Sequence, residues 1–322
     1  MATVALISNP MSTGNREVLP RVREFAARSS EIFHYEIGAV EEVPAALKTI
    51  ALTKPKVLVI NGGDGTVQSI LTELQHGKPF GDAPPPLAVL PNGKTNLIAL
   101  DLGAGDDALQ ALQRILDIAE TGVEPHLTAR KLISLNDGQN ERPVMGMFLG
   151  GAGLASSILF CRHKLYPLGI PNWMAHVLTT ITAVLVFVVG LRWRWIPLAQ
   201  KKVSISVRRQ GRKLEGSFFL LMITTLERVL MNVGGSGAED NRLGMMVIEQ
   251  GRGAVMKAAW STLKGRLGAD PFKGMHLDSG DEIRITGEGS DVILDGEHFR
   301  APQGGSLVLT PTAPVSFLKL AA

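Results

Sequence analysis

The part of this chain best suited to chemistry is the loop Asn61–Thr66 (NGGDGT), which lies between an apolar run and a helical pattern. Its three glycines let the backbone turn sharply and bring N–H groups close to a phosphate. Thr66 is predicted to cap the following helix, whose positive dipole end would then face the anion. Asp64 fits such a cradle when a cation accompanies the phosphate, as in a magnesium nucleotide. The alternative is a plain turn with an Asx cap.

Two more polar loops, Asn9–Gly14 (NPMSTG) and Pro91–Asn96 (PNGKTN), also follow predicted strands. Gly93 begins a Gly-Lys-Thr run like the end of a P-loop, but Ala88 stands where a P-loop requires its first glycine. Lys94 is still expected to contact phosphate through its charge. All three loops would lie at the carboxyl edge of one parallel sheet, where α/β proteins bind their ligands. The convergence indicates a nucleotide site.

The elements that position these loops alternate along the first third of the chain. The predicted strands are Thr3–Ser8, Glu31–Ile37, Lys56–Ile60 and Pro86–Leu90, and the predicted helices are Arg16–Arg28, Val43–Leu52, Val67–Leu74 and Asp106–Thr121. Strands alternating with helices predict a Rossmann-like α/β domain with a doubly wound parallel sheet.

From about Leu127 the pattern changes to short strands separated by glycine or polar turns, which predicts an antiparallel β domain. The predicted strands are Lys131–Leu135, Val144–Leu149, Val203–Val207, Ser217–Ile223, Met245–Glu249, Glu282–Thr286, Val292–Leu294 and Ser306–Thr310. Helical stretches are expected around 154–190 and 252–266. We therefore predict a nucleotide-binding domain over 1–125, to which 311–322 return, and a β-rich second domain over 126–310.

Composition excludes several classes of protein. The chain has 322 residues, 45% of them hydrophobic, which is enough for one or two domains with a proper core. A net charge of +3 does not support nucleic-acid binding. One cysteine excludes an internal disulfide framework and a Cys-based zinc site. No secretory leader is recognisable, so a cytoplasmic protein is expected.

The segment 165–191 contains no formally charged residue and ends in an almost purely aliphatic run. Its length permits a membrane span, but its prolines, glycine and polar residues disfavour one. A helix packed on the β domain is slightly favoured from the residues alone. A lipid-facing lid with Trp and Arg at the headgroup level is the second reading, and a span is the third.

The three loops, together with the late Leu294–Glu297 (LDGE), resemble the diacylglycerol kinase catalytic-domain family. That family also includes sphingosine and ceramide kinases and bacterial soluble lipid kinases. The GGDGT motif is shared with NAD kinases, whereas the late Asp-Gly-Glu favours the lipid branch. The resemblance implies an ATP-dependent kinase with a Rossmann-like first domain, a β-sandwich second domain and an active site between them. It would transfer the γ-phosphate of ATP to the hydroxyl of a long-chain lipid.

The resemblance also implies which residues act. Asp295 and Glu297 would form the catalytic set with Asp64, and one of the first two would take the proton from the lipid hydroxyl. A hairpin turn carrying two solvated acids is the alternative for that pair. The residues implied for the nucleotide are Asn9, Pro10, Ser12, Thr13, Gly14, Gly62, Gly63, Asp64, Gly65, Thr66, Lys94 and Asn96.

The stretch Gly234–Val247 resembles the family loop that holds a structural Mg²⁺. Carried over by position, Asp240 supplies the carboxylate, and Gly237 and Arg242 supply carbonyls. Asn241 stands where the family usually has glycine, and a metal-free turn is the alternative.

Two departures bear on the substrate: Lys94 replaces a threonine of the family motif, and Leu97 replaces an aspartate. Sphingosine kinases also lack that acid, so diacylglycerol, ceramide and a sphingoid base all remain open. An NAD kinase-like enzyme and a non-catalytic binding protein are the other classes.

A lipid substrate gives weight to peripheral association with the inner face of a membrane. The contact residues would then lie in or next to the apolar segment, at Val184, Val186, Phe187 and Trp193.

Overall fold

The computed structural model describes residues 3–93, 96–152, 203–207, 212–226, 242–264, 266–287 and 290–321. The chain divides into two compact units. The first comprises Met1–Leu132, Val144–Gly146 and Thr312–Ala322, and the second comprises Ile133–Pro143 and Met147–Pro311.

The first unit is built on a six-stranded sheet in the order β2-β1-β3-β4-β18-β5. Its strands are β1 (Val4–Ser8), β2 (Ile32–Glu36), β3 (Val57–Asn61), β4 (Leu87–Val89), β5 (Leu127–Arg130) and β18 (Val315–Leu318). Neighbouring strands are parallel except that β5 runs antiparallel to β18. This pairing carries the first unit past the predicted boundary near 125 and brings the end of the chain into its sheet.

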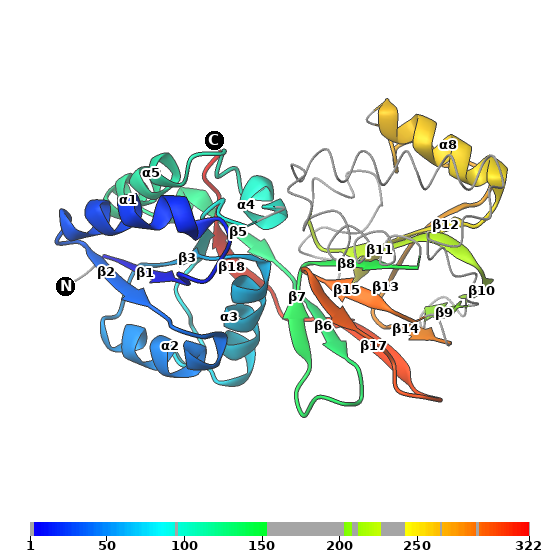
Figure 1. Ribbon diagram of the computed structural model, residues 1–322, viewed down its shortest axis with the longest axis horizontal. Coiled ribbons are helices and arrows are strands. Elements are labelled where there is room, and N and C mark those ends of the chain that lie inside the picture. The colour runs from blue at the N-terminus through cyan, green and yellow to red at the C-terminus, as the bar shows by residue number, and fades with distance from the viewer. Residues whose placement is uncertain are drawn as a thin grey trace. The chain divides into compact units, whose positions relative to one another are not determined.

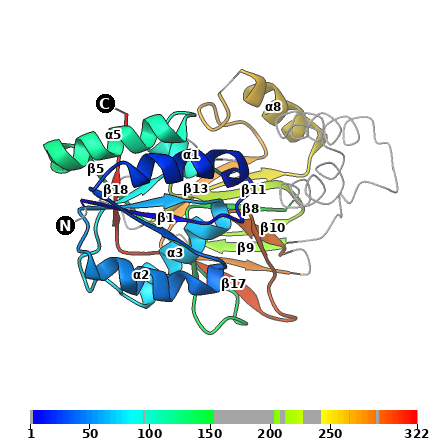
Figure 2. The ribbon, with the colours of Figure 1, turned by 60° about the vertical axis from the view of Figure 1, so that its left-hand side comes forward.

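Helices cover both faces of this sheet, so every residue of β1 and β3 is buried (Figures 1 and 2). On one face lie α1 (Asn15–Ala27) and α5 (Ala108–Thr121), and on the other lie α2 (Val43–Leu52) and α3 (Asp64–His76). The short helices η1 (Val40–Glu42), α4 (Leu97–Asp101) and η2 (Glu124–His126) complete the unit. The predicted doubly wound α/β fold is confirmed.

The second unit contains two antiparallel sheets, as predicted. One has the order β10-β9-β14-β17-β6, with β10 (Arg212–Gly216), β9 (Val203–Val207), β14 (Ile283–Thr286), β17 (Ser306–Pro311) and β6 (Ile133–Asn136). The other has the order β13-β12-β11-β8-β15-β16, with β13 (Met275–Gly280), β12 (Leu243–Glu249), β11 (Phe218–Thr224), β8 (Phe148–Gly151), β15 (Val292–Leu294) and β16 (Glu297–Phe299).

Side-chain alternation shows which faces of these sheets are covered. In β14, Ile283 and Ile285 are buried whereas Arg284 between them is exposed, so one face meets the core. In β12 the burial is continuous from Leu243 to Ile248, so both faces are covered. One of those faces packs against α8 (Arg252–Leu263).

The strand predicted over Val144–Leu149 is wrong in one respect, because it is divided at Met147 into β7 (Val144–Gly146) and β8. Met147 does not continue a strand: its N–H donates to the Asp295 side chain, and its carbonyl accepts from the N–H of Thr225. The helical stretch predicted around 154–190 lies outside the described residues.

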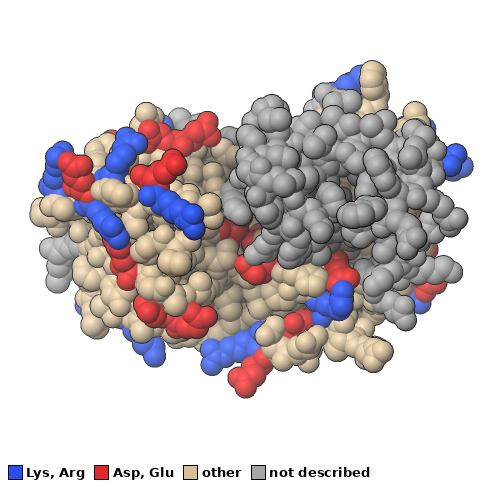
Figure 3. Space-filling model, viewed as in Figure 1, with Lys and Arg blue, Asp and Glu red and all other residues tan. Residues whose placement is uncertain are grey.

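The surface of the first unit carries charges of both signs. On the face shown in Figure 3, Lys and Arg side chains of this unit lie among Asp and Glu side chains. The interspersed pattern agrees with the small net charge of +3.

Candidate functional site

The loops after β1 and β3 are joined by hydrogen bonds between side chains and backbone. Asn9 Nδ2 donates to Thr66 Oγ1 over 2.8 Å, and the Gly63 N–H donates to Ser12 Oγ over 2.9 Å. Asn9, Ser12 and Thr66 are all buried, at 6%, 9% and 3% exposure. The structure therefore brings together five predicted residues of the nucleotide set: Asn9, Ser12, Gly62, Gly63 and Thr66.

A buried network of side-chain amides lies beneath these loops and includes the loop after β4. Asn92 Nδ2 donates to Asn61 Oδ1 over 2.6 Å and to Asn15 Oδ1 over 3.2 Å. Asn15 Nδ2 donates to the carbonyls of Asn9, at 2.8 Å, and Asn61, at 3.0 Å. A buried polar network of this kind specifies one arrangement of the backbone because each unpaired member would be costly.

Asn15, Asn61 and Asn92 were not among the predicted site residues. A signal was available for two of them, since Asn61 ends β3 and Asn92 follows β4, whereas Asn15 is the first residue of α1. Nothing in the sequence indicated that the amides bond to one another.

Two glycines in these loops are required by packing. A Cβ on Gly14 would lie 2.2 Å from the Asn92 carbonyl oxygen, and a Cβ on Gly62 would lie 2.7 Å from Thr66 Cβ. These distances are too short for any side chain, so Gly14 permits the close approach of the loops after β1 and β4, and Gly62 permits the sharp turn from β3 into α3.

Gly63 is different, because neither packing nor backbone conformation requires a glycine there. Its φ is −82°, which any residue adopts, and among the described residues other than its chain neighbours a Cβ on it would come near only Ser12 Oγ, at 3.7 Å. The position is the N-cap of α3, where backbone N–H groups at the start of a helix are available to an anion. A side chain at this position would therefore be tolerated by the described surroundings, in contrast to Gly14 and Gly62.

Thr66 does not cap α3, contrary to the prediction. The helix begins at Asp64, so Thr66 lies inside its first turn, and its hydroxyl accepts from Asn9 instead. Its observed contact therefore joins two loops.

Asp64 and Asn96 border the loop after β4. A Cβ on Gly93 would lie 3.2 Å from Asp64 Oδ1 and 3.1 Å from Asn96 Oδ1. Asn96 has a φ of +50° and accepts from the Gly93 N–H over 2.6 Å, closing the loop just before α4 begins at Leu97. The carboxylate of Asp64 thus lies beside this loop, on the first residue of α3.

The other predicted nucleotide residues lie on the same loops or outside the described part. Thr13 is exposed, while Pro10 and Gly65 are partly buried. Lys94 lies outside the described residues. Contact of this set with a nucleotide remains a prediction.

In the second unit, Asp295 and Gly296 form the two-residue turn of the hairpin β15–β16. Their φ values of +44° and +88° are those of a type I′ turn, for which Asp-Gly is a favoured sequence. A hairpin was the alternative reading of this motif, but its two acids are not equally solvated.

The carboxylate of Asp295 is buried, at 8% exposure, and holds the start of β8. Its Oδ2 accepts from the Met147 N–H over 2.8 Å, and its Oδ1 accepts from the Phe148 N–H over 3.0 Å. Glu297, the first residue of β16, is exposed. The two carboxylates of the motif therefore differ in their surroundings: one is bound to backbone, and the other faces solvent.

The predicted magnesium and membrane residues mostly fall outside the described residues. This holds for Asp240 and Gly237, and for the predicted membrane contacts Val184, Val186, Phe187 and Trp193. Arg242 is described and lies immediately before β12. Within the described ranges, no group of three or more His, Cys, Asp or Glu side chains is placed to hold a metal ion.

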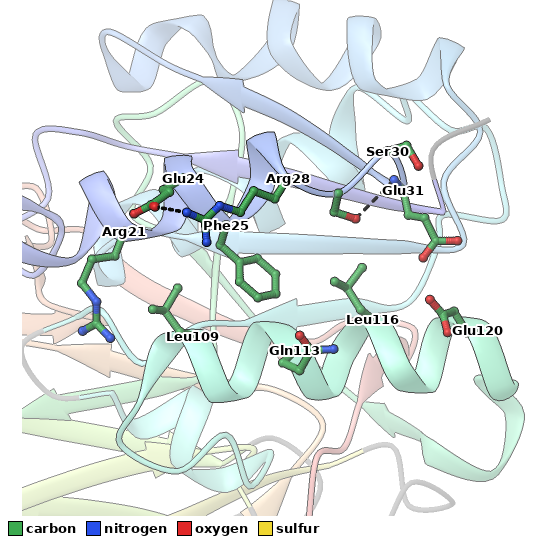
Figure 4. A pocket seen from close by; sticks show the side chains of 11 residues that line it. Arg21, Glu24, Phe25, Arg28, Ser30, Glu31, Leu109, Gln113, Leu116 and Glu120 are labelled. Carbon is green, nitrogen blue, oxygen red and sulfur yellow. Dashed lines mark hydrogen bonds and ion pairs between the residues drawn. The ribbon is translucent and has the colours of Figure 1, made fainter.

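A groove of about 630 Å³ lies between α1 and α5 (Figure 4). Phe25 of α1 faces Leu116 of α5, and Glu31 at one end raises the pKa of Glu120 by hydrogen bonding and charge repulsion. None of the residues that line the groove belongs to the three loops after β1, β3 and β4.

In the part of the chain that is described, no helix is both long and apolar enough to cross a membrane.

Comparison with known proteins gives the family context. Residues 3–124 match the model of the diacylglycerol kinase catalytic domain. A Bacillus anthracis structure described as "a putative diacylglycerol kinase" is 18% identical with a TM-score of 0.62, and the match covers 96% of this chain and 94% of that one. A second, of a diacylglycerol kinase from the same organism, is 16% identical with a TM-score of 0.58, and covers 98% and 96%.

No curated protein matches the chain. The match of residues 3–124 nevertheless contains all three loops after β1, β3 and β4, together with the amide network that joins them. The resemblance to the diacylglycerol kinase catalytic-domain family is therefore confirmed over residues 3–124, and the chain as a whole has the fold of those bacterial structures.

Proposed function

We propose that this protein is an ATP-dependent lipid kinase that transfers the γ-phosphate of ATP to a hydroxyl of a long-chain lipid. The observation that carries the proposal is the open space at Gly63. A glycine that packing does not require, at the N-cap of a helix and between two tightly joined loops, is what a phosphate-binding backbone needs. The family matched by these residues supports the same activity.

A divalent cation is part of the proposal, and the residues present suit one. Asp64 follows Gly63 in the chain and its carboxylate lies beside Gly93 in the loop after β4, and oxygen ligands of this kind hold Mg²⁺ together with substrate phosphates. Bound there, the ion would neutralise charge on the transferring phosphoryl group. The family-derived set Asp240, Gly237 and Arg242 is proposed as a separate, structural magnesium site.

The proposed general base is Glu297. A base must reach the proton it removes, and an exposed carboxylate is available for this. The oxygens of Asp295 are bonded to the backbone of Met147 and Phe148 and position the hairpin instead. In the proposed step, the lipid hydroxyl oxygen bonds to the γ-phosphorus, its proton goes to Glu297, and ADP leaves.

The lipid acceptor is proposed as a class that comprises diacylglycerol, ceramide and sphingoid bases. Diacylglycerol is supported by the match of residues 3–124 to the diacylglycerol kinase catalytic domain. Leu97 removes an acid that the family motif carries, which keeps the sphingoid class open. Peripheral contact with a membrane surface follows from either substrate.

The experiment is transfer of label from [γ-³²P]ATP with Mg²⁺ to a panel of mixed-micelle lipids. The panel holds diacylglycerol, monoacylglycerol, ceramide and sphingosine, with soluble NAD as a separate arm. Label in one lipid class is expected. Label only in NAD would favour an NAD kinase-like enzyme, and ATP binding without transfer would favour a binding protein.

A further inference from the structure

Helix α8 exposes two large apolar side chains, Met256 and Trp260, which an ordinary surface helix would turn toward the core. Its buried residues are Ala254, Val255 and Ala258, and the two alanines pack in a cluster with Met222, Met246, Ile248 and Met275. By contrast, Met256 is 53% exposed and Trp260 is 62% exposed. A surface helix normally turns its large apolar residues toward the core and its polar residues outward.

The exposed residues form a stripe. Arg252, Met256, Trp260 and Lys264 recur every four residues, so they follow one another along a single side of the helix. All four are exposed. The Lys264 ammonium lies 4.9 Å from the centroid of the Trp260 ring, which is cation–π geometry. We call these four residues the α8 stripe.

The charge on this helix has one sign only. Residues 252–264 contain Arg252, Lys257 and Lys264 and no Asp or Glu. Lys257 is exposed next to Met256 in sequence. Two large apolar side chains are thus bracketed by cations at both ends of the stripe.

We propose that the α8 stripe is a contact surface for an anionic lipid bilayer. Trp is favoured at the boundary between headgroups and acyl chains, and an exposed Met adds apolar area that can enter that boundary. Lys and Arg near the surface of an anionic leaflet each add about 1 kcal/mol of attraction. The helix needs only to lie flat on the bilayer, because its inner face already packs on β12 and β13.

The charge pattern favours a lipid surface over a protein partner. A bilayer rich in phosphatidylglycerol presents negative charge everywhere around an inserted Trp, which matches cations at both ends of the stripe. The membrane contact deepens the proposed function, since a kinase for lipids must reach them. Its role in a kinase reaction rests on the proposed function. The physical evidence is α8 itself and does not involve the segment 165–191.

The test is co-sedimentation with phosphatidylcholine vesicles with and without phosphatidylglycerol. The wild-type protein should bind the anionic vesicles, and Met256→Ser/Trp260→Ser should lower the partition coefficient at least about tenfold. Leu52→Ser is the matched control, because Leu52 is 83% exposed but lies on α2 without such a stripe. Arg252→Gln/Lys264→Gln should weaken binding and reduce its salt dependence.

The proposal would be overturned if the Met256→Ser/Trp260→Ser protein bound anionic vesicles as strongly as the wild type does. The proposal would also be overturned if the wild-type protein did not bind vesicles but self-associated through the stripe, since that result would assign α8 to a protein interface. Activity on water-soluble short-chain analogues of diacylglycerol, ceramide and sphingosine separates this inference from the proposed function. If that activity is absent while vesicle binding depends on the stripe, the kinase proposal fails and the membrane surface stands. If that activity is present while vesicle binding does not depend on the stripe, the membrane surface fails and the kinase proposal stands.

Discussion

Asn92 Nδ2 lies 2.6 Å from Asn61 Oδ1, and this buried amide pair ties the loop after β4 to the end of β3. Asn61 in turn donates to Ser8 Oγ over 2.9 Å, at the end of β1. Three neighbouring strand ends are therefore held in register by side chains. Loops that must hold a triphosphate at fixed positions gain most from such preorganisation.

The amide network should contribute strongly to stability. Asn61→Ala removes a fully buried side chain together with its hydrogen bonds to Asn92 and Ser8, so the free energy of unfolding should fall by about 2–4 kcal/mol. Urea unfolding followed by circular dichroism measures the change. Gln110→Ala, at an exposed position on α5, is the control and should change stability by less than about 0.5 kcal/mol. An equally small change for Asn61→Ala would contradict the network.

Two glycine substitutions should separate a packing role from a binding role. Gly63→Ala should leave the melting temperature nearly unchanged, because the described residue nearest to its Cβ is Ser12, whose Oγ lies 3.7 Å away, but should weaken ATP binding about tenfold or more by occupying the proposed phosphate space. Gly14→Ala should lower the melting temperature, because its Cβ would collide with the Asn92 carbonyl.

Differential scanning fluorimetry and calorimetric titration with ATP measure the two effects. A Gly63→Ala protein that binds ATP as tightly as the wild type would remove this loop from the nucleotide site.

The two acids of the β15–β16 hairpin should respond differently to substitution. Asp295→Ala leaves the N–H groups of Met147 and Phe148 without their acceptor and should cost about 2–4 kcal/mol of stability. Glu297→Gln is an exposed change and should cost less than about 0.5 kcal/mol. Urea unfolding of both variants checks this, and equal losses would show that the carboxylates have equivalent roles.

Stability should depend on the protonation of His34. Burial lowers the pKa of His34 below its ordinary value of 6.5, with Arg23 acting in the same direction and Glu36 opposing. Its Nε2 lies 2.8 Å from Ser8 Oγ, which already accepts from Asn61, so neutral His34 can accept the Ser8 hydroxyl proton. The folded state thus favours neutral His34.

Because the unfolded chain binds this proton more readily, the free energy of unfolding should fall as pH drops below about 6.5 toward the folded-state pKa. Glu36 acts at lower pH, since its hydrogen bond to Arg23 lowers its pKa below 4.5. Urea unfolding of wild type and His34→Gln between about pH 7 and about pH 5 tests this. Identical pH slopes for the two proteins would contradict it.

The sequence predicted the first unit well because its elements carry local signals. Strands such as β1 and β3 are continuous apolar runs. Helix α5 has a regular apolar face, and its N-cap is Asp107, whose side chain accepts from the N–H groups of Leu109 and Gln110. The start of α3 was predicted at Val67 and lies at Asp64, because the prediction assigned Asp64, Gly65 and Thr66 to the glycine-rich loop.

What the sequence could not supply was long-range pairing. The division at Met147 depends on Asp295, far along the chain, and the return of β18 is set by its pairing with β4 and β5. The amide network depends on three asparagines that converge only after the sheet has formed. Local patterns do not encode such contacts.

The most direct measurement is transfer of ³²P from [γ-³²P]ATP into extracted lipid by wild type and Glu297→Gln under identical conditions. We expect the label in a long-chain lipid alcohol. The rate of transfer should be about 10²–10⁴ times lower for Glu297→Gln, and the affinity of that variant for ATP should be unchanged. A folded wild-type protein that binds ATP and labels no lipid would contradict the proposed lipid kinase activity. Equal rates for the two proteins would contradict the role of Glu297.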